Sequence, residues 1–548
     1  MNPLSQLIQH LDHHFSLDEL RELTLTLDVE WENLSGDTRT VKSRELVELL
    51  NRNGRLPELI QLAQNHRPHL NWRDLPQFEQ RISRYGVPME KPPRAAHFTN
   101  REDDLAQLLA DLQPGQVATL CGPGGIGKTA LAAEAIWTLA PGTTPPQQFP
   151  DGILFHSFYG RPQIDLVLEK IVVAYGDEPK PNPLAAAQRV LGGRQALLLL
   201  DGAEEADNLP QLLQVRGGCG VLVTSRSRRD AAASRQDVAP LSIPHAVALL
   251  QKRGGKWAAE EAAATAICEQ VGGWPLAVRL AGRYLQEAEE TAAEYAAWLA
   301  TTLLAALSLG THQAENGEVL LERSVTQVDE TARRLLGLVG QLALQPVAAA
   351  GLAAAVALPV SQLKQGWRQL LGYGLLQKRG DGYEATHPLI HTYASRRLEP
   401  AAEDFARLVA YYHELAQTES QKGLPGYRRL DGERAHIMRL LSGCVRREDW
   451  RQAIRLAWAV NDHLFIQGFV TELINASQFG LIASQKQGSQ RGEESFLSWL
   501  GLAYRALGQV EKAICCLEEA LAIFVAIKSP YAEMAQRQLD ELKGKANA

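Results

Sequence analysis

The residue types best suited to chemistry lie in one glycine-rich stretch, residues 122–129, which reads Gly-Pro-Gly-Gly-Ile-Gly-Lys-Thr. It fits the spacing G-x-x-x-x-G-K-[ST], in which glycines let the backbone turn tightly and aim its N–H groups at phosphates. In this pattern Lys128 reaches the β- and γ-phosphates, and the Thr129 hydroxyl ligates Mg²⁺. The motif therefore predicts a nucleotide site made by Gly122, Gly124, Gly125, Ile126, Gly127, Lys128 and Thr129.

A second candidate residue ends an apolar run. Residues 196–201 read Ala-Leu-Leu-Leu-Leu-Asp, which predicts a buried strand that delivers the Asp201 carboxylate to the Mg²⁺ shell. Gly202 stands where a second acid often follows, and Glu204 and Glu205 are expected to form an exposed charge pair rather than to polarise water. We therefore expect slow hydrolysis, with Thr129 and Asp201 as the metal ligands.

A third candidate, Arg226, follows the buried run Val-Leu-Val-Thr-Ser of residues 221–225. At the end of a strand it could reach the γ-phosphate and sense which nucleotide is bound; an ordinary surface arginine is the alternative. Lys128, Asp201 and Arg226 are thus the catalytic candidates.

These residues need a sheet to position them. Residues 117–121 and 153–156 read as further strands, and residues 130–136 and 184–193 as helices. Since strands alternate with helices through 103–240, a parallel sheet with right-handed crossovers is expected. The helix after residue 129 would place its N-terminus at the phosphates.

Length and composition allow several domains and favour helix. The chain has 548 residues and a formal net charge of −7, which gives no general attraction to nucleic acid or anionic membranes. The six cysteines form no disulfide or metal pattern, and neither a signal peptide nor a membrane span is expected. These features favour the cytoplasm, with no membrane partner.

The flanking segments divide into further expected domains. Residues 1–67 read as a small helical bundle with a capping box at residues 16–19, and residues 68–96 as a proline-containing linker. Residues 97–240 hold the nucleotide motifs and residues 241–321 are helical. Residues 322–399 combine helices with a hairpin signal at residues 380–382, which indicates a winged helix. Residues 400–548 are helical, and residues 499–520 match the tetratricopeptide pattern. A packed helical cap without a ligand is the alternative to a sensor there.

The bundle at the N-terminus resembles the death-like effector-associated domains of bacterial signalling proteins. The resemblance is carried by residues 15–23, 44–47 and 54–59. It implies an adapter that pairs with a like domain on a separate effector, and it implies no enzyme.

The order of motifs over residues 97–399 resembles the NB-ARC branch of the STAND signalling ATPases, which includes plant disease-resistance proteins and the apoptotic protease-activating factor. The resemblance implies that Phe98, Asn100 and Arg101 hold the adenine side, and that Pro275 lies near the nucleotide. It also implies that His387 holds the ADP phosphate in a closed state.

Two departures from the family pattern flank His387 and bear on that closed state. Thr386 and Pro388 replace the methionine and aspartate that flank this histidine in the family.

Together these features predict a multidomain, mainly α protein with one α/β domain. Its predicted function is that of a switch operated by ATP and ADP, which requires Mg²⁺. On activation it would form a homo-oligomer and recruit an effector protein through residues 1–67, in bacterial defence or cell-death signalling. A protein or peptide trigger would act on residues 400–548.

The alternative is a STAND-type transcription regulator that binds DNA. Residues 361–370, the expected recognition helix, carry only Lys364 and Arg368 as basic residues, so nucleic acid is not expected as a partner. A slow ATPase is the one activity expected, because no other catalytic domain is seen.

Overall fold

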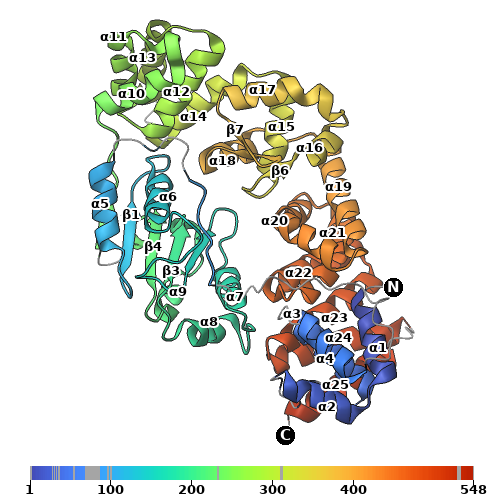
Figure 1. The fold of residues 1–548 in the computed structure, drawn as a ribbon. Helices are drawn as coiled ribbons and strands as arrows, with labels where there is room; N and C mark the ends of the chain where they lie inside the picture. The colour runs from blue at the N-terminus through green and yellow to red at the C-terminus, as the bar shows by residue number, and fades with distance from the viewer. Residues whose placement is uncertain are drawn as a thin grey trace. The chain divides into compact units, whose positions relative to one another are not determined.

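The computed structural model describes residues 3–27, 29, 31, 34, 38–52, 56–67, 87–94, 98, 101–230, 234–308, 313–527 and 532–546. Most of them are helical, and two sheets are present. The chain divides into two compact units, drawn in Figure 1. We call Met89–Val167 with Leu191–Tyr411 the P-loop unit, and Met1–Pro88 with Leu168–Val190 and Tyr412–Ala548 the terminal unit. The six domain ranges expected from the sequence remain a prediction.

A five-stranded parallel sheet forms the centre of the P-loop unit, in the order β2-β3-β4-β1-β5. Its strands are β1 (Val117–Cys121), β2 (Ile153–Ser157), β3 (Leu197–Asp201), β4 (Gly220–Ser225) and β5 (Ser234–Asp237). The strands β3 and β4 are buried along their whole length, which explains their continuous apolar runs. The expected parallel sheet is confirmed, and β5 is an additional strand that the sequence did not indicate.

Helices precede and connect these strands along the chain. They are α5 (Glu102–Asp111), α6 (Lys128–Leu139), α7 (Ile164–Ala174), α8 (Pro183–Leu191) and α9 (Leu209–Val215), with the short 3₁₀ turn η3 (Ala203–Glu205). Leu131, Ala135 and Ile136 of α6 are fully buried against the sheet. The carboxyl ends of β1, β3 and β4 therefore meet at one edge, as they must in a parallel sheet.

The rest of the P-loop unit is helical apart from one small sheet. It contains α10 (Ile243–Gly254), α11 (Glu261–Gln270), α12 (Pro275–Ala288), α13 (Ala292–Ser308), α14 (Gln313–Thr326), α15 (Glu330–Gln341), α16 (Ala349–Val356), α17 (Lys364–Gly372) and α18 (Pro388–Arg397). The strands β6 (Val347–Ala348), β7 (Leu376–Arg379) and β8 (Gly382–Ala385) pair antiparallel in the order β6-β8-β7. The expected hairpin is thus present around residues 380–382, after the helices, and α18 follows it directly.

The N-terminal part of the terminal unit has its own core. Within the described residues of 1–67, four α-helices are α1 (Pro3–His14), α2 (Leu17–Thr26), α3 (Arg39–Arg52) and α4 (Leu56–His66). Ser16 and Glu19 cap α2 reciprocally, with Ser16 N donating to Glu19 Oε2 at 2.9 Å and Glu19 N donating to Ser16 Oγ at 3.2 Å. Thirteen buried apolar residues, among them Phe15 and Leu46, fill the bundle.

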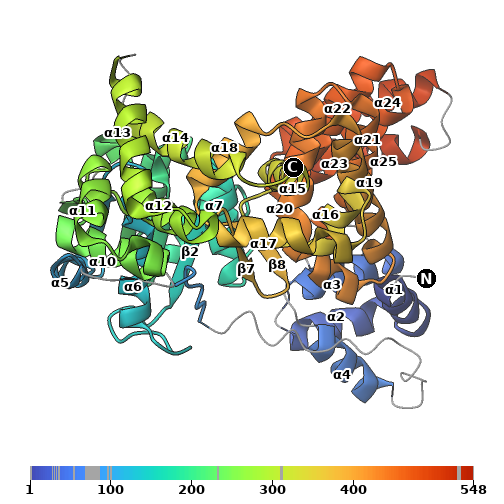
Figure 2. The ribbon, with the colours of Figure 1, turned by 90° about the horizontal axis from the view of Figure 1, so that it is seen from above.

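The C-terminal part is a run of long helices, and from α20 onward each helix packs on the next (Figures 1 and 2). They are α19 (Ala402–Ser420), α20 (Leu424–Arg446), α21 (Trp450–Ile466), α22 (Val470–Gln487), α23 (Gln490–Ala506), α24 (Val510–Ala526) and α25 (Ala532–Ala546). Short turns with glycine at positive φ, such as Gly468 and Gly488, separate successive helices. Within the described residues, no helix combines the length and apolar character needed to cross a membrane.

Candidate functional site

The glycine-rich stretch forms the loop between β1 and the start of α6, as the motif predicts. Lys128 is the first residue of α6 and is 5% exposed. Its Nζ donates hydrogen bonds to Gly122 O at 2.7 Å and to Pro123 O at 3.0 Å. Burial lowers the pKa of the Lys128 ammonium, although nearby carboxylates oppose the effect. The lysine is therefore held across the loop that would surround phosphates.

Thr129 and Asp201 lie side by side. The Thr129 hydroxyl donates to Asp201 Oδ1 at 2.6 Å, and Thr224 donates to the same oxygen at 2.7 Å. Burial raises the pKa of Asp201, while these two hydrogen bonds favour the carboxylate.

A hydroxyl beside a carboxylate fits Mg²⁺, which prefers oxygen ligands and keeps several waters or phosphate oxygens. The described part of the chain contains no cluster of three or more His, Cys, Asp or Glu side chains that could hold a metal ion. Waters or phosphate oxygens would therefore have to complete the shell of a Mg²⁺ ion at Thr129 and Asp201.

Arg226 follows β4 and is paired with Glu204. Its Nε lies 3.0 Å from Glu204 Oε1, and its backbone N donates to Glu204 Oε2 at 3.0 Å. The Tyr159 hydroxyl donates to Glu204 Oε1 at 3.1 Å. The side chain of Glu204 is only 12% exposed, so its expected place in an exposed pair with Glu205 is wrong. The end of β4 brings the guanidinium to this carboxylate, a contact that sequence spacing does not reveal.

The ring of Tyr159 also explains why Gly202 stands where a second acid often follows. A Cβ atom built on Gly202 would lie 2.7 Å from Tyr159 Cε2, and Gly202 has a φ of +73°. Both the space and the backbone therefore favour glycine.

His387 lies at the N-cap of α18, near the same loop. Its Nδ1 accepts a hydrogen bond from Leu389 N at 3.1 Å. Burial, followed by the charges of Arg279, Arg226 and Lys128, lowers the pKa of His387 to about 3. The imidazole is thus neutral at physiological pH, with its proton on Nε2.

Side chains from two other parts of the chain approach Gly124. A Cβ atom built there would lie 3.3 Å from Arg226 Nε and 3.4 Å from Leu389 Cδ1. The residue after β4 and the start of α18 therefore both contact the loop.

The residues around Pro275 pack on the opposite part of the loop. Pro275 is the first residue of α12, and Leu276 N donates to Gly125 O at 3.3 Å. A Cβ atom on Gly125 would lie 2.9 Å from Leu276 and 3.0 Å from Trp274. Glycine is therefore required for this close approach, which positions the start of α12 against the loop.

The residues expected on the adenine side are partly described. Arg101 is 8% exposed and donates to Ile126 O at 3.0 Å and to Ala239 O at 2.8 Å, which fixes it behind the loop. Phe98 packs against the core of the sheet. Asn100 lies outside the described residues.

Arg279 of α12 was not anticipated. Burial and the neighbouring Arg283 lower its pKa, and its charge acts on His387. Lys128, Arg226 and Arg279 thus bring three cations to one place, which suits an anionic ligand. The only sequence signal was its position four residues after Pro275, one helical turn away on the same face of α12.

Parts of this chain are similar to known proteins. Residues 5–68 match the family model described as effector-associated domain 7. The regulatory protein AfsR of Streptomyces coelicolor is 28% identical over 386 residues, which covers 63% of this chain and 38% of that relative. AfsR of Streptomyces griseus is 31% identical over 217 residues, which covers 36% of this chain and 22% of that relative. The chain thus spans less than two fifths of the length of these relatives.

Solved structures that are similar to parts of this chain include a signal transduction ATPase with numerous domains and a tetratricopeptide repeat sensor, from Pyrococcus horikoshii. It has a TM-score of 0.41 and 15% identity, covering 84% of this chain and 82% of that one. A Walker-type ATPase of Pyrococcus abyssi has a TM-score of 0.27 and 13% identity, covering 56% of this chain and 99% of that one. The chain therefore carries an effector-associated domain at residues 5–68, as its sequence predicted, together with a five-stranded P-loop core.

Proposed function

We propose that this protein is a cytoplasmic signalling switch operated by ATP and ADP with Mg²⁺. Activation forms a homo-oligomer, and residues 1–67 then recruit an effector in bacterial defence or cell-death signalling. Residues 322–399 act as a winged helix, and the repeat-like helices of residues 400–548 sense a protein or peptide trigger. The family match at residues 5–68 supports the recruiting role.

One observation carries the nucleotide-switch proposal. Arg226 and Leu389 both reach Gly124, although they belong to different parts of the P-loop unit. A loop contacted from the end of β4 and from the start of α18 can couple its ligand to both elements. Such coupling requires contacts that differ between two states of the protein.

Arg226 supplies one differential contact. It forms its ion pair with Glu204, and a γ-phosphate offers the guanidinium a stronger, doubly charged partner. The exchange of Glu204 for a γ-phosphate would distinguish ATP from ADP. The position of Gly202, where no second acid can stand, is consistent with slow ATP hydrolysis.

His387 supplies the second contact. Because Nδ1 is used by Leu389 N, the neutral ring has one N–H, on Nε2, to donate to a phosphate. That bond would join the start of α18 to ADP in the closed state and would be absent from the open state. The replacement of its family neighbours by Thr386 and Pro388 means that the bond has no carboxylate support from position 388.

The test is the oligomeric state of His387→Ala, measured without ligand by size-exclusion chromatography with light scattering. We expect the wild-type protein to be a monomer that co-purifies with ADP, and His387→Ala to form oligomers. The exposed His245 provides a matched control variant, His245→Ala, which should remain monomeric. A monomeric His387→Ala protein that still binds ATP would refute the lock.

A second candidate function is transcription regulation through DNA. It is favoured by the similarity to the AfsR regulatory proteins, and this similarity leaves the predicted absence of nucleic acid partners without support. Lys364 and Arg368 of α17 are both exposed. Retention of duplex DNA on filters at moderate salt, lost in a Lys364→Gln/Arg368→Gln variant, would favour this alternative over the switch.

A further inference from the structure

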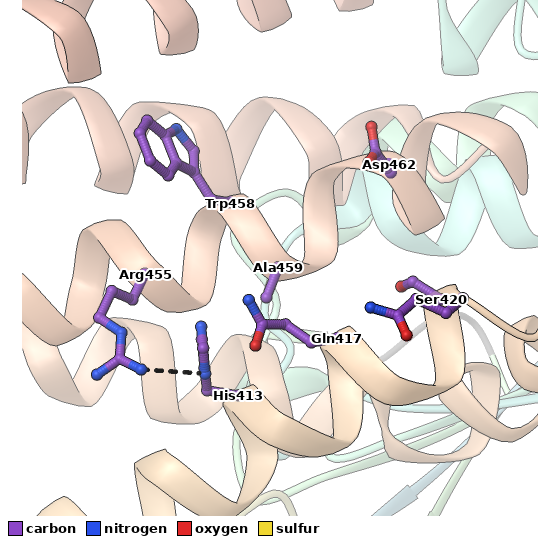
Figure 3. Close-up of a pocket in the computed structure, with 8 residues that line it drawn as sticks. His413, Gln417, Ser420, Arg455, Trp458, Ala459 and Asp462 are labelled. Carbon is purple, nitrogen blue, oxygen red and sulfur yellow. Dashed lines mark hydrogen bonds between the residues drawn. The ribbon is translucent and has the colours of Figure 1, made fainter.

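A groove between α19 and α21 has the features of a built binding site. It encloses about 430 Å³, within the range of ordinary ligand pockets, and both helices belong to the terminal unit where they line it. Figure 3 shows side chains of both helices around it. Those used below are His413, Gln417, Ser420, Arg455, Trp458 and Asp462.

The two ends of the groove carry opposite charges, a guanidinium and a carboxylate, and neither charge is paired with a side chain of opposite sign among the described residues. Among the described residues, neither Arg455 nor Asp462 forms an ion pair with another side chain. The polar contact of Arg455 is a hydrogen bond of 3.5 Å to His413 Nδ1, and burial together with Arg455 lowers the pKa of His413. The histidine is therefore neutral and leaves the guanidinium charge uncompensated.

The carboxylate of Asp462, at the other end of the groove, also lacks an oppositely charged partner among the described residues. Its side chain is reachable from solvent, yet the surrounding protein removes part of its hydration and raises its pKa. A cation placed beside it would restore the stability of the carboxylate. The groove thus lacks an anion at one end and a cation at the other.

The spacing of the charges defines the ligand. Arg455, Trp458 and Asp462 recur at three and four residues on one face of α21, so the charged residues are about 10 Å apart along the helix. A peptide in the polyproline II conformation rises about 3.1 Å per residue and completes a turn every three residues. Two of its side chains three positions apart therefore lie on one face, about 9 Å apart, and match these charges. The open form of the groove suits a chain that continues at both ends.

The middle of the groove offers what a peptide backbone requires. The amide of Gln417 can both donate and accept, and the buried Ser420 Oγ has no hydrogen-bond partner in the described chain. Trp458 is 44% exposed and provides an apolar surface between the two charges. A buried hydroxyl without a partner is costly, and a ligand carbonyl or amide would satisfy it.

From these observations we propose that the groove between α19 and α21 binds a peptide segment in the polyproline II conformation with an acidic and a basic residue three positions apart. The acidic side chain lies at Arg455, the basic side chain at Asp462, and the peptide backbone between them crosses Trp458. The proposal deepens, and rests on, the sensor role of residues 400–548, for which it defines the chemistry of the trigger.

Blocked hexapeptides test the charge pattern with the full-length protein. In one pair of pools lysine and glutamate are fixed three positions apart, in either order, and the other positions are randomised. Glutamine replaces one or both charged residues in the control pools. Calorimetry should show that one of the doubly charged pools binds at least five-fold more tightly than every control pool.

Variants assign that binding to the groove. Arg455→Gln and Asp462→Asn should each weaken the preferred pool roughly five- to ten-fold. The matched change Arg451→Gln alters an exposed charge of α21 outside the groove and should have no effect. The exchange Arg455→Glu/Asp462→Arg should transfer the preference to the pool with the opposite order of charges, a gain that misfolding cannot produce.

Three results would overturn the peptide proposal. The first is that charged and neutral peptide pools bind with equal affinity. The second is that the pool with glutamate alone binds as tightly as the doubly charged pool, which indicates a simple anion site. The third is that Arg451→Gln and Arg455→Gln weaken peptide binding equally. Fluorescent ADP binding is measured on the same samples. If ADP binds but the charged peptides do not, the groove proposal fails and the nucleotide switch stands; the reverse result removes the switch alone.

Discussion

The ion pair between Arg226 and Glu204 yields a quantitative prediction. The change Glu204→Gln keeps the shape of the side chain but removes its charge. Arg226 then does not have to break an ion pair before it binds the γ-phosphate. The phosphate also no longer faces a nearby negative charge. The affinity for ATP should therefore rise relative to the affinity for ADP.

The magnitude follows from the exposure of the pair. Hydrogen bonds to charged groups contribute about 1.5–3 kcal/mol when buried, and exposed ion pairs about 1 kcal/mol or less. Glu204 is 12% exposed but Arg226 is 34% exposed, with a separation of 3.0 Å. We therefore take about 1 kcal/mol, which changes the ratio of the two dissociation constants about five-fold.

The assay is competition of ATP and ADP against a fluorescent nucleotide, with Glu205→Gln as the exposed neighbouring control. A double-mutant cycle with Arg226→Gln tests the cause, since Glu204→Gln should change the ratio little once the arginine is absent. The reasoning is refuted if the ratio stays constant, if Glu205→Gln shifts it equally, or if the shift persists in the Arg226→Gln background.

Three further predictions concern the loop, the N-terminal domain and His387. Lys128→Ala should abolish binding of fluorescent ADP while circular dichroism shows unchanged melting of the helices; unchanged ADP affinity would contradict the assignment of the loop. Deletion of residues 1–67 should preserve ADP affinity and nucleotide-driven assembly but remove effector recruitment in a pull-down, and loss of ADP binding would show that the boundary is misplaced. The folded pKa of His387, about 3, lies below its unfolded value near 6.5, so the unfolded state binds more protons as the pH falls through this interval. Between pH 7 and 5.5 the free energy of unfolding of the wild-type protein should therefore fall by up to about 1.4 kcal/mol more than that of His387→Gln. Denaturation curves measured at both pH values test this, and an equal fall for the two proteins would contradict the lowered pKa of His387.

Local motifs were predictable from the sequence because their function depends on neighbouring residues. The loop at residues 122–129 and the apolar strand before Asp201 carry this local information, and both appear where expected. The strand β5 was missed because its residues, Ser-Arg-Gln-Asp, are polar and pair through the backbone at the edge of the sheet.

The site was less predictable wherever the fold unites distant segments. Glu204 was expected at the surface, since adjacent acids after a strand are usually solvated, but Arg226 and Tyr159 converge on it from neighbouring strands. The position of Arg279 after Pro275 was not a sufficient signal, because a single arginine within a helix resembles any surface cation. The roles of the candidate residues in binding and turnover remain predictions.

The packing of Tyr159 against Gly202 has a consequence for how this site can change by mutation. A carboxylate introduced at position 202 alone would collide with the ring and occupy a left-handed backbone position. Replacement of Tyr159 alone would remove a hydrogen bond to Glu204 without adding an acid. Each single step is therefore unfavourable, and only the pair of substitutions opens a path to a second acidic residue. The two positions are therefore coupled, because the cost of a side chain at position 202 depends on which residue stands at position 159.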